Sequence, residues 1–194
     1  MWSFLIVTLL AVDLFGGSIK RCQSYAQDVR RAHWTQFGVD YPYQYGVGQL
    51  VQESGCRNIL SRDGVGSQGL PQITWRWHKS TLQKHGIRSI DAIGDQLKAQ
   101  AILMRQMWVP KYGLWVTYQV YNGGGLVLKE INRAGGENWE RAKANCKRGQ
   151  SCFTYKGVKT CRDNCDINYE YSVLVWKYGG NYGSVKTAGR YRYW

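Results

Sequence analysis

Apolar residues at helical spacing, in runs that end at glycine, are the feature that most constrains the fold of this chain. In Asp95–Met107 they recur at every third or fourth position, as on the buried face of a helix, and Asp95 is the expected N-cap. Leu114–Tyr121 is a second apolar run, which stops at Asn122-Gly123-Gly124-Gly125 because glycine readily takes the backbone conformation that ends a helix. Helices are therefore predicted at Val47–Glu53 (ended by Gly55), Asp95–Met107, Leu114–Tyr121, Leu126–Arg133, Asn138–Cys146 and Tyr169–Tyr178.

Strand signals are few. Phe153–Thr160 has the pattern of a small hairpin around Gly157, and Arg57–Gly69 is rich in small polar residues and glycine, which predicts a long loop. We find no internal repeat and no linker that would separate a second domain. A chain of 194 residues suits one compact domain with a short extra segment. The expected fold is thus a mainly α (α+β) domain over residues 20–194 with a small β-hairpin.

The N-terminus carries an apolar run, Trp2–Phe15, followed by Gly16-Gly17-Ser18. Its length of about 14 residues is short of the ~20 that a spanning helix needs, but it suits the hydrophobic region of a signal peptide. Lys20 and Arg21 follow the run and no cation precedes it, which opposes ordinary export. Residues 1–19 are therefore predicted to be a signal peptide or a weak signal-anchor helix that directs the chain to the periplasm or cell envelope. A buried N-terminal helix of a cytosolic protein is the alternative.

Cysteine usage indicates an oxidising compartment. An even number of cysteines favours disulfides. The spacing of the last four, within twenty residues, is unlike the C-x2-4-C pairs of zinc sites, and none of the three histidines is near them. Spacing alone leaves the pairing open, including whether Cys22 has a partner in its own chain. The six residues are Cys22, Cys56, Cys146, Cys152, Cys161 and Cys165.

Charge and aromatic content narrow the class of partner. The chain has 26 Lys and Arg against 13 Asp and Glu, a net charge of +13, so polyanions attract it. Its 9 Trp and 14 Tyr offer flat faces that stack on bases or sugar rings, but such residues also fill cores. These two features by themselves leave nucleic acid and polysaccharide as equal candidates.

Three short segments carry the candidate chemistry. They are Gln52-Glu53-Ser54-Gly55, then Gly69-Leu70-Pro71-Gln72-Ile73, and Tyr121-Asn122-Gly123-Gly124 about fifty residues later. Taken separately, each has a bland interpretation as a surface pair, a turn or a helix stop. Together and in this order they resemble the lytic transglycosylase branch of the lysozyme superfamily. That family has Glu-Ser at the end of one helix, then Gly-Leu-Met-Gln, then Ala-Tyr-Asn-Ala-Gly, and a late Tyr.

The resemblance covers roughly Tyr43–Tyr178, with departures. Pro71 replaces the usual Met, and Val120 and Gly123 stand where Ala is usual. The late tyrosine is either Tyr169 or Tyr171. The basic, cysteine-bearing C-terminal part is also similar to glycosidases that bacteriophages encode for host lysis, which suggests an endolysin. The resemblance therefore implies a lysozyme-like fold and cleavage of the β-1,4 bond between N-acetylmuramic acid and N-acetylglucosamine in peptidoglycan.

The chemistry implied for this family needs one carboxylate. Glu53 would protonate the leaving oxygen and then act as base on the C6 hydroxyl of the same muramic acid, giving a 1,6-anhydro product without water. An acid of this kind needs apolar surroundings that raise its pKa, and the candidates for those walls are Val47, Leu50, Leu70 and Ile73. The resemblance places substrate contacts at Ser54, Gly69, Leu70, Gln72, Tyr121 and Asn122, and implies that Tyr169 or Tyr171 holds Glu53 through its hydroxyl.

A hydrolytic muramidase is the alternative reaction. An inverting hydrolase would need a second carboxylate ~6.5–9.5 Å from the first to activate water, and Asp63 is the candidate in the predicted loop. Asp63 before Gly64 also suits a plain turn. We therefore favour the transglycosylase. Trp75 and Trp77 could form a sugar-stacking wall or be buried, and the basic stretch Lys143–Arg148 is expected to be a solvated face attracted to the carboxylates of peptidoglycan stems.

A nucleic-acid-binding protein is the main alternative from another class. The basic and aromatic composition permits it, but the sequence has no helix-turn-helix, zinc-finger or RNA-binding aromatic signature. A catalytically dead glycan-binding module is a third possibility, against which Glu53 argues. The expected partner is thus the glycan strand of peptidoglycan, with a membrane contact through the N-terminal segment, no nucleic acid, no metal or organic cofactor, and a monomeric chain.

Overall fold

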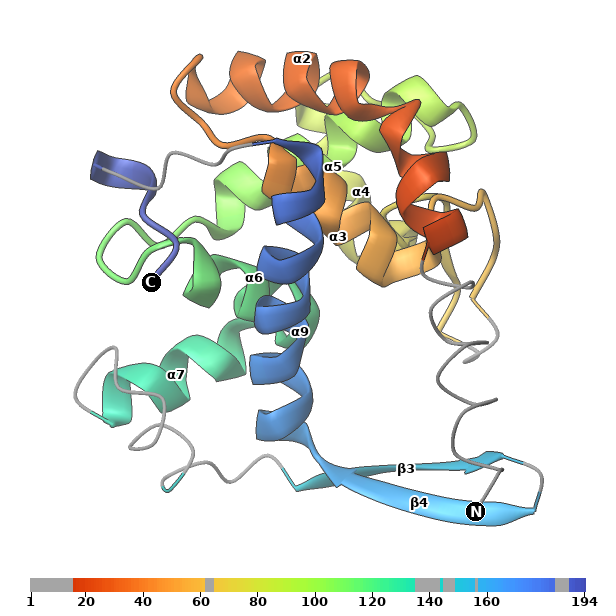
Figure 1. Ribbon diagram of the computed structural model, residues 1–194, viewed down its shortest axis with the longest axis vertical. Helices are drawn as coiled ribbons and strands as arrows, with labels where there is room; N and C mark the ends of the chain where they lie inside the picture. The colour runs from red at the N-terminus through yellow and green to blue at the C-terminus, as the bar shows by residue number, and fades with distance from the viewer. Residues whose placement is uncertain (1–15, 62–64, 135–143, 145–148, 156, 184–188) are drawn as a thin grey trace. The chain divides into compact units, whose positions relative to one another are not determined.

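The computed structural model describes residues 16–61, 65–134, 144, 149–155, 157–183 and 189–194 (Figure 1). This part of the chain is mainly helical, with two antiparallel sheets of two strands each, so the predicted mainly α class is confirmed. The apolar run Trp2–Phe15, almost all of the predicted helix Asn138–Cys146, and Asp63 lie outside the described residues.

Figure 1 colours the helices and strands in chain order, from red at the N-terminus to blue at the C-terminus. The helices are α2 (Ala26–Phe37), α3 (Gln44–Ser54), α4 (Trp75–Lys84), α5 (Ile93–Met107), α6 (Leu114–Gly123), α7 (Gly125–Arg133) and α9 (Asn164–Gly179), with the short 3-10 helices η1 (Gly180–Tyr182) and η2 (Gly189–Tyr191). The strands are β1 (Ser67–Gln68), β2 (Ile73–Thr74), β3 (Gln150–Tyr155) and β4 (Val158–Asp163). Residues 16–23 form a further helical segment before α2. None of the described helices is long and apolar enough to cross a membrane.

The chain divides into two compact units, each drawn from two separate parts of the sequence. The first unit contains the described residues of Met1–Arg105 and Lys177–Lys186, and the second those of Gln106–Trp176 and Thr187–Trp194. The first therefore holds α2 to α4, α5 as far as Arg105, and the β1–β2 pair. The second holds α6, α7, the β3–β4 hairpin and α9 as far as Trp176.

In the first unit, α2 and α3 approach closely at Gly46. A Cβ added there would lie 2.7 Å from Cε1 of His33, so only glycine permits this packing. The His33 ring is fully buried and stacks on Tyr41 with 5.2 Å between ring centroids. Its Nδ1–H donates to the carbonyl of Val29 at 3.0 Å, while no described residue bonds to the buried Nε2. Desolvation lowers the pKa of His33 to about 4.

A pair of buried amides joins α3 to α5. Nε2 of Gln100 donates to the carbonyl of Gly46 at 3.0 Å and to Oε1 of Gln49 at 2.8 Å. Both glutamine side chains are completely buried. A buried polar group that loses its partner costs more free energy than the bond contributes, so this pair sets one register between the two helices.

In the second unit, the end of the chain caps the start of α6. The backbone N–H groups of Leu114 and Trp115 donate to the carbonyls of Arg192 and Tyr193 at 2.9 and 3.0 Å. The first N–H groups of a helix have no partner within it, so the carbonyls of Arg192 and Tyr193 satisfy two of them. Gly113 permits this contact, because a Cβ added there would lie 2.9 Å from the carbonyl oxygen of Arg192.

Aromatic side chains form the core around this cap. Tyr193 is almost fully buried, stacks on Tyr118 and donates its hydroxyl to the carbonyl of Ser172 at 2.5 Å. Trp115 packs against Trp194, with 5.7 Å between ring centroids. Part of the high aromatic content therefore serves packing in the second unit rather than recognition.

The predicted hairpin is confirmed, and it is longer than expected. β3 and β4 pair with Cys152 opposite Cys161, and the two sulfurs form a disulfide. At the end of β4, the carboxylate of Asp163 accepts a hydrogen bond from the backbone N–H of Cys165 at 2.7 Å. This contact caps the helix, which explains why α9 begins at Asn164 rather than at the predicted Tyr169.

Two other helix boundaries differ from the prediction. The N–H of Gln96 already donates to the carbonyl of Ala92, so α5 starts before Asp95, which lies in its first turn and is not the N-cap. α6 continues through Asn122 and Gly123 and ends against Gly124, whose positive φ of 72° is a backbone conformation that glycine tolerates. The predicted loop Arg57–Gly69 includes β1, a strand too short to give a sequence pattern.

Lowering the pH should reduce the stability of the first unit, because the buried His33 resists protonation in the folded chain. The unfolded chain takes up a proton near pH 6.5, whereas the folded chain takes it up only near about pH 4. His33 thus contributes stability that is complete above pH 6.5 and is lost as the pH falls, by roughly 3 kcal/mol between pH 7 and pH 4. Chemical denaturation over this pH range checks it, since His33→Gln should remove this part of the pH dependence. The exposed His85→Gln is the matched control and should retain it. Parallel pH profiles for His33→Gln and wild type would contradict the assignment.

Candidate active site around Glu53

Glu53 lies in the last turn of α3 and is partly buried. The helix ends at Gly55, which has a φ of 60° and donates its N–H to the carbonyl of Val51 at 3.1 Å. This is the left-handed ending that glycine provides, as the sequence predicted. The four residues expected to form apolar walls for the carboxyl are all buried: Val47, Leu50, Leu70 and Ile73.

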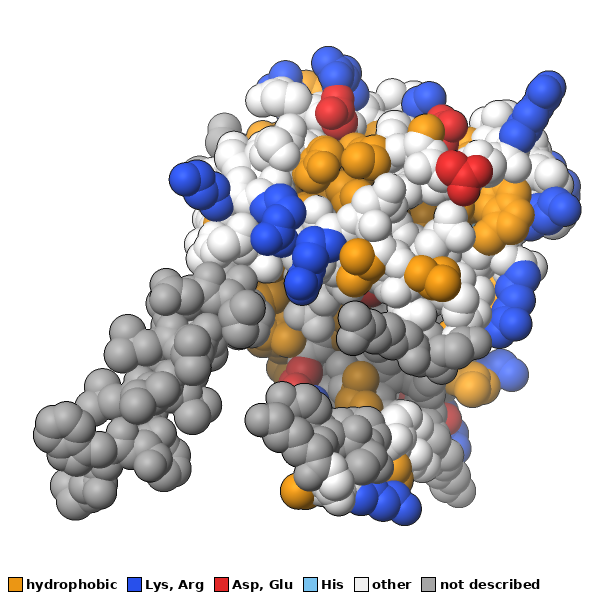
Figure 2. All heavy atoms as spheres, turned by 90° about the vertical axis from the view of Figure 1, so that its right-hand side faces the viewer, with side chains coloured by type: hydrophobic (Ala, Val, Ile, Leu, Met, Phe, Trp, Pro, Cys, Tyr) orange, Lys and Arg blue, Asp and Glu red, His pale blue; other side chains and the backbone are white. Residues whose placement is uncertain are grey.

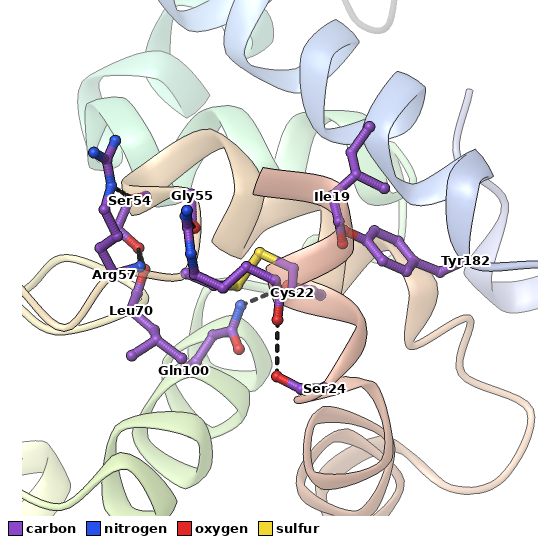
Figure 3. Close-up of a disulfide and its surroundings, with 12 residues drawn as sticks. Ile19, Cys22, Ser24, Ser54, Gly55, Arg57, Leu70, Gln100 and Tyr182 are labelled. Carbon is purple, nitrogen blue, oxygen red and sulfur yellow. Dashed lines mark hydrogen bonds between the residues drawn. A yellow bond between two sulfur atoms is a disulfide. The ribbon is translucent and has the colours of Figure 1, made fainter. Parts of the chain in front are cut away.

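Ser54 connects the end of α3 to the second predicted segment. Its side chain is buried, and its hydroxyl donates to the carbonyl of Leu70 at 2.8 Å (Figure 3). The same oxygen accepts the backbone N–H of Arg57 at 3.2 Å. The hydroxyl is therefore engaged within the protein, and it brings together two segments sixteen residues apart in the sequence.

The side-chain amide of Gln96, on α5, holds the same segment from the other side. Its Oε1 accepts the N–H of Leu70 at 2.9 Å. Its Nε2 donates to the carbonyl of Ile90 and to Oδ1 of Asn58, each at 2.9 Å. Gln96 is 1% exposed, so these bonds form away from water, where leaving any of them unmade is costly. Leu70 is thus fixed through both its N–H and its carbonyl.

The turn at Gly69 and Gln72 has an unusual backbone. Gly69 has a φ of 81°, and a Cβ added there would lie 2.4 Å from Oε1 of Gln96. Gln72 has a φ of 51°, although it is not glycine, and its Nε2 donates to the carbonyls of Gly69 at 2.8 Å and Ile59 at 3.0 Å. These bonds stabilise the turn, so the amide nitrogen of Gln72 is engaged in positioning.

Two residues in the segments around Glu53 have a strained backbone conformation. Among the described residues other than glycine, only Cys56 and Gln72 have a positive φ, at 56° and 51°. Such conformations cost of order 1–3 kcal/mol each, and they persist where the surrounding structure enforces them, most often at functional sites. Both residues lie in the two segments that Ser54 ties together. The strain therefore marks the same site as the sequence motifs.

The helical segment before α2 is fixed to the turn that follows Glu53. Cys22 and Cys56 form a disulfide with 5.3 Å between their Cα atoms (Figure 3), and both residues are buried. Nη1 of Arg21 donates to the carbonyl of Gly55 at 2.5 Å. Gly55 also packs tightly on Ser18, since an added Cβ would lie 2.6 Å from the Ser18 hydroxyl. We call these contacts of Ser18, Arg21 and Cys22 the N-terminal clamp.

The short helix η1 also contacts the segment that carries the N-terminal clamp. The hydroxyl of Tyr182 donates to the carbonyl of Ile19 at 3.0 Å (Figure 3), and burial raises the pKa of this tyrosine. Gly179, just before η1, allows close packing because an added Cβ would lie 2.5 Å from Cδ1 of Tyr45 on α3. The clamp segment thus has fixed contacts on both sides within the first unit.

Tyr121 and Asn122, the third predicted segment, belong to the last turn of α6 in the second unit. Tyr121 is partly buried and Asn122 is exposed. The glycines that follow end the helix and start α7 at Gly125, so the backbone here is accessible. A contact of this segment with a sugar stays a prediction.

The two candidate late tyrosines lie on α9. Tyr171 is buried, whereas Tyr169 is partly exposed and packs edge-on against Trp115, with 6.3 Å between ring centroids. Residues two apart on a helix point about 200° apart, so the two hydroxyls face different sides of α9. Only one of them can support a given carboxylate, and the choice between them stays open.

Sequence reasoning did not find Gln96 or Arg21. Gln96 lies in a helix that is predicted from the spacing of its apolar residues. Nothing in the sequence distinguishes this glutamine from an exposed one. Arg21 stands out in the sequence only as a cation after the apolar run. Within the described part of the chain, no group of three or more His, Cys, Asp or Glu side chains gathers as a metal site would require.

The described surface is rich in cations. On the face drawn in Figure 2, Lys and Arg side chains are spread among exposed hydrophobic ones, and acidic side chains are fewer. Compared with protein family models, with curated proteins and with solved structures, the chain has no significant match.

Gly69→Ala should destabilise the turn between Gly69 and Gln72. The new Cβ would collide with Gln96 and would strain a backbone at φ 81°. We expect the free energy of unfolding to fall by roughly 2–4 kcal/mol. Gly66→Ala is a matched control, because Gly66 has a φ of 82° with nothing within 4 Å of an added Cβ, so only the backbone strain of about 1 kcal/mol remains. Urea denaturation of the two variants compares them directly, and equal losses would mean that the contact with Gln96 contributes nothing.

Removing the clamp disulfide should loosen the turn after Glu53. Cys22→Ala with Cys56→Ala opens a loop of sequence separation 34, which chain entropy values at about 4 kcal/mol. Hydrogen exchange at the amides of Gly55, Cys56 and Arg57 should become at least ~10-fold faster, as a local loss of about 1.4 kcal/mol already gives that factor. The control is Cys152→Ala with Cys161→Ala, a disulfide in the other unit, which should leave these amides unchanged. Unchanged exchange in the first variant would show that hydrogen bonds alone hold the turn.

Proposed function

We propose that this protein is a lytic transglycosylase that cleaves the β-1,4 bond between N-acetylmuramic acid and N-acetylglucosamine in peptidoglycan, with Glu53 as acid and base. The motif order of the sequence supports the proposal. The observation that carries it is the hydrogen bond from Ser54 to the carbonyl of Leu70, because it joins the Glu53 turn to the Gly69–Gln72 segment. Two segments that resemble the family only together and in order are therefore joined directly in the fold.

Rigidity at this place suits the reaction. A catalytic acid works when it is held within hydrogen-bond reach of the atom that it protonates, and misplacement by about 1 Å is costly. Gln96, Ser54 and the N-terminal clamp all fix backbone next to Glu53. In this proposal Ser54 and Gln72 position the backbone around Glu53. Tyr121 and Asn122, in the second unit, keep the role in binding N-acetyl sugars that the resemblance implies.

The proposed reaction uses Glu53 twice. Its carboxylic acid gives a proton to the glycosidic oxygen, so the bond from C1 of the muramic acid to that oxygen breaks and N-acetylglucosamine leaves with a free hydroxyl. The resulting carboxylate then accepts the proton of the C6 hydroxyl on the same muramic acid. The C6 oxygen attacks C1 and closes a 1,6-anhydro ring, and Glu53 returns to its acid form. No water is consumed, so the scheme needs no second carboxylate.

Product analysis tests the proposal. Purified peptidoglycan is incubated with the full chain and with Glu53→Gln, and the released muropeptides are identified by mass spectrometry. Wild type should release 1,6-anhydro-muropeptides, and Glu53→Gln should reduce their release by at least ~10³-fold, since an amide has no proton to transfer at this step. Glu130→Gln, on α7, is a control carboxylate that should retain activity.

Other products would change the conclusion. Muropeptides with reducing ends would make the protein a muramidase and would direct attention to Asp63 as the residue that activates water. Release of nothing by the wild-type chain would overturn the enzymatic proposal, and equal release by both forms would remove Glu53 from the mechanism.

A further inference from the structure

α4 begins at Trp75, three residues after Gln72, and has an outward face with a distinct composition. Only one residue of this helix, Leu82, is fully buried, and the partly buried Trp75 and His78 lie on the same side at helical spacing. The opposite side is exposed over its whole length. We define the α4 face by its exposed residues Arg76, Trp77, Lys79, Ser80, Gln83 and Lys84.

Trp77 is the most exposed large hydrophobic side chain among the described aromatic residues, at 64%. Burial would normally be expected of a tryptophan, since its large apolar surface is costly to leave in water. The guanidinium of Arg76 lies over its ring, 5.4 Å from the centroid, and this cation–π contact steadies the indole on the surface. The indole ring of Trp77 is therefore exposed to solvent as a flat surface, and its orientation is stabilised by Arg76.

The charge around Trp77 has one sign. Residues 64–90 contain Arg76, Lys79, Lys84 and Arg88 and no Asp or Glu. The ion pairs among the described residues engage other cations, such as Arg31 and Lys98, and none of these four. The α4 face therefore offers unneutralised positive charge beside an exposed aromatic ring, which complements a ligand with flat apolar rings and carboxylates.

We infer that the α4 face is a binding surface for peptidoglycan strands, with Trp77 stacking on a sugar ring and Lys79 and Lys84 attracting the carboxylates of the stem peptides. This inference rests on the proposed function and gives it a substrate-holding surface outside the Glu53 turn. Trp77 is five residues after Gln72, so their Cα atoms lie within roughly 17 Å of each other. A strand held on α4 would therefore stay close to the Gly69–Gln72 turn.

A membrane surface fits this face less well. An interfacial helix buries a continuous apolar stripe in the lipid, and several large apolar side chains form it. The α4 face has one such side chain, Trp77, and the remaining residues are charged or polar. One aromatic ring among cations and hydrogen-bonding groups is instead the composition that a charged sugar polymer requires.

Binding to purified sacculi tests the inference. All forms carry Glu53→Gln, so that the sacculi stay intact and binding is measured apart from cleavage. Trp77→Ala should weaken sedimentation with sacculi by about 10-fold, and Lys79→Gln with Lys84→Gln by about 3-fold at low salt. Trp176→Ala and Lys129→Gln are matched controls on exposed positions of α9 and α7 and should bind as the parent does. Amidation of the sacculus carboxylates should weaken the parent to the level of the lysine variant.

The outcomes separate the inference from the proposed function. Normal binding by Trp77→Ala, with its thermal midpoint unchanged, would overturn the α4 surface while leaving the muropeptide result for Glu53 intact. Binding of the parent to phosphatidylglycerol vesicles that is lost in Trp77→Ala, without binding to sacculi, would overturn it in favour of a membrane surface. Loss of sacculus binding only in Trp77→Ala and the lysine variant supports it even if the cleavage product is a reducing sugar.

Discussion

The buried amide of Gln96 holds together parts of the first unit that are distant in sequence. It accepts the N–H of Leu70 and donates to Ile90 and Asn58. One side chain on α5 thus fixes the segment after the long loop, the residues just before its own helix, and the residue after the Glu53 turn. Because the group is shielded from water, any of these bonds that stays unmade raises the free energy of the fold. The segment can therefore take one position only.

The position of the Leu70 segment in turn determines the backbone conformation around Glu53. Gly69 must lack a side chain because Gln96 occupies the space, and Gln72 takes a left-handed conformation to close the turn. The carbonyl of Leu70 then faces Ser54, and the disulfide of Cys22 holds the far side of the same turn. Each contact is modest alone, but all of them converge on the end of one helix. Such convergence holds the strained backbone at Cys56 and Gln72, and with it the segments on either side of Glu53, in place.

The aromatic residues divide between two roles. Tyr41, Tyr45, Tyr118 and Tyr193 are fully buried and shape the cores of the two units. Trp77 is exposed, with its ring under a guanidinium and in a region without acids. Composition alone could not separate these roles, because burial depends on which face of a helix a neighbouring element covers.

The sequence by itself determined the mainly α class, the helix that ends at Gly55, the hairpin around Gly157 and the presence of disulfides, because each depends on local periodicity, on glycine or on cysteine number. It also suggested Glu53 through the order of three short motifs. Only the tertiary structure decided which cysteines pair and which groups fix the Glu53 turn. Gln96 bonds across 26 residues to Leu70, and Arg21 across 34 to Gly55. Such partners are chosen by packing in three dimensions, and a polar residue on a helix has the same local pattern whether it is later buried or solvated.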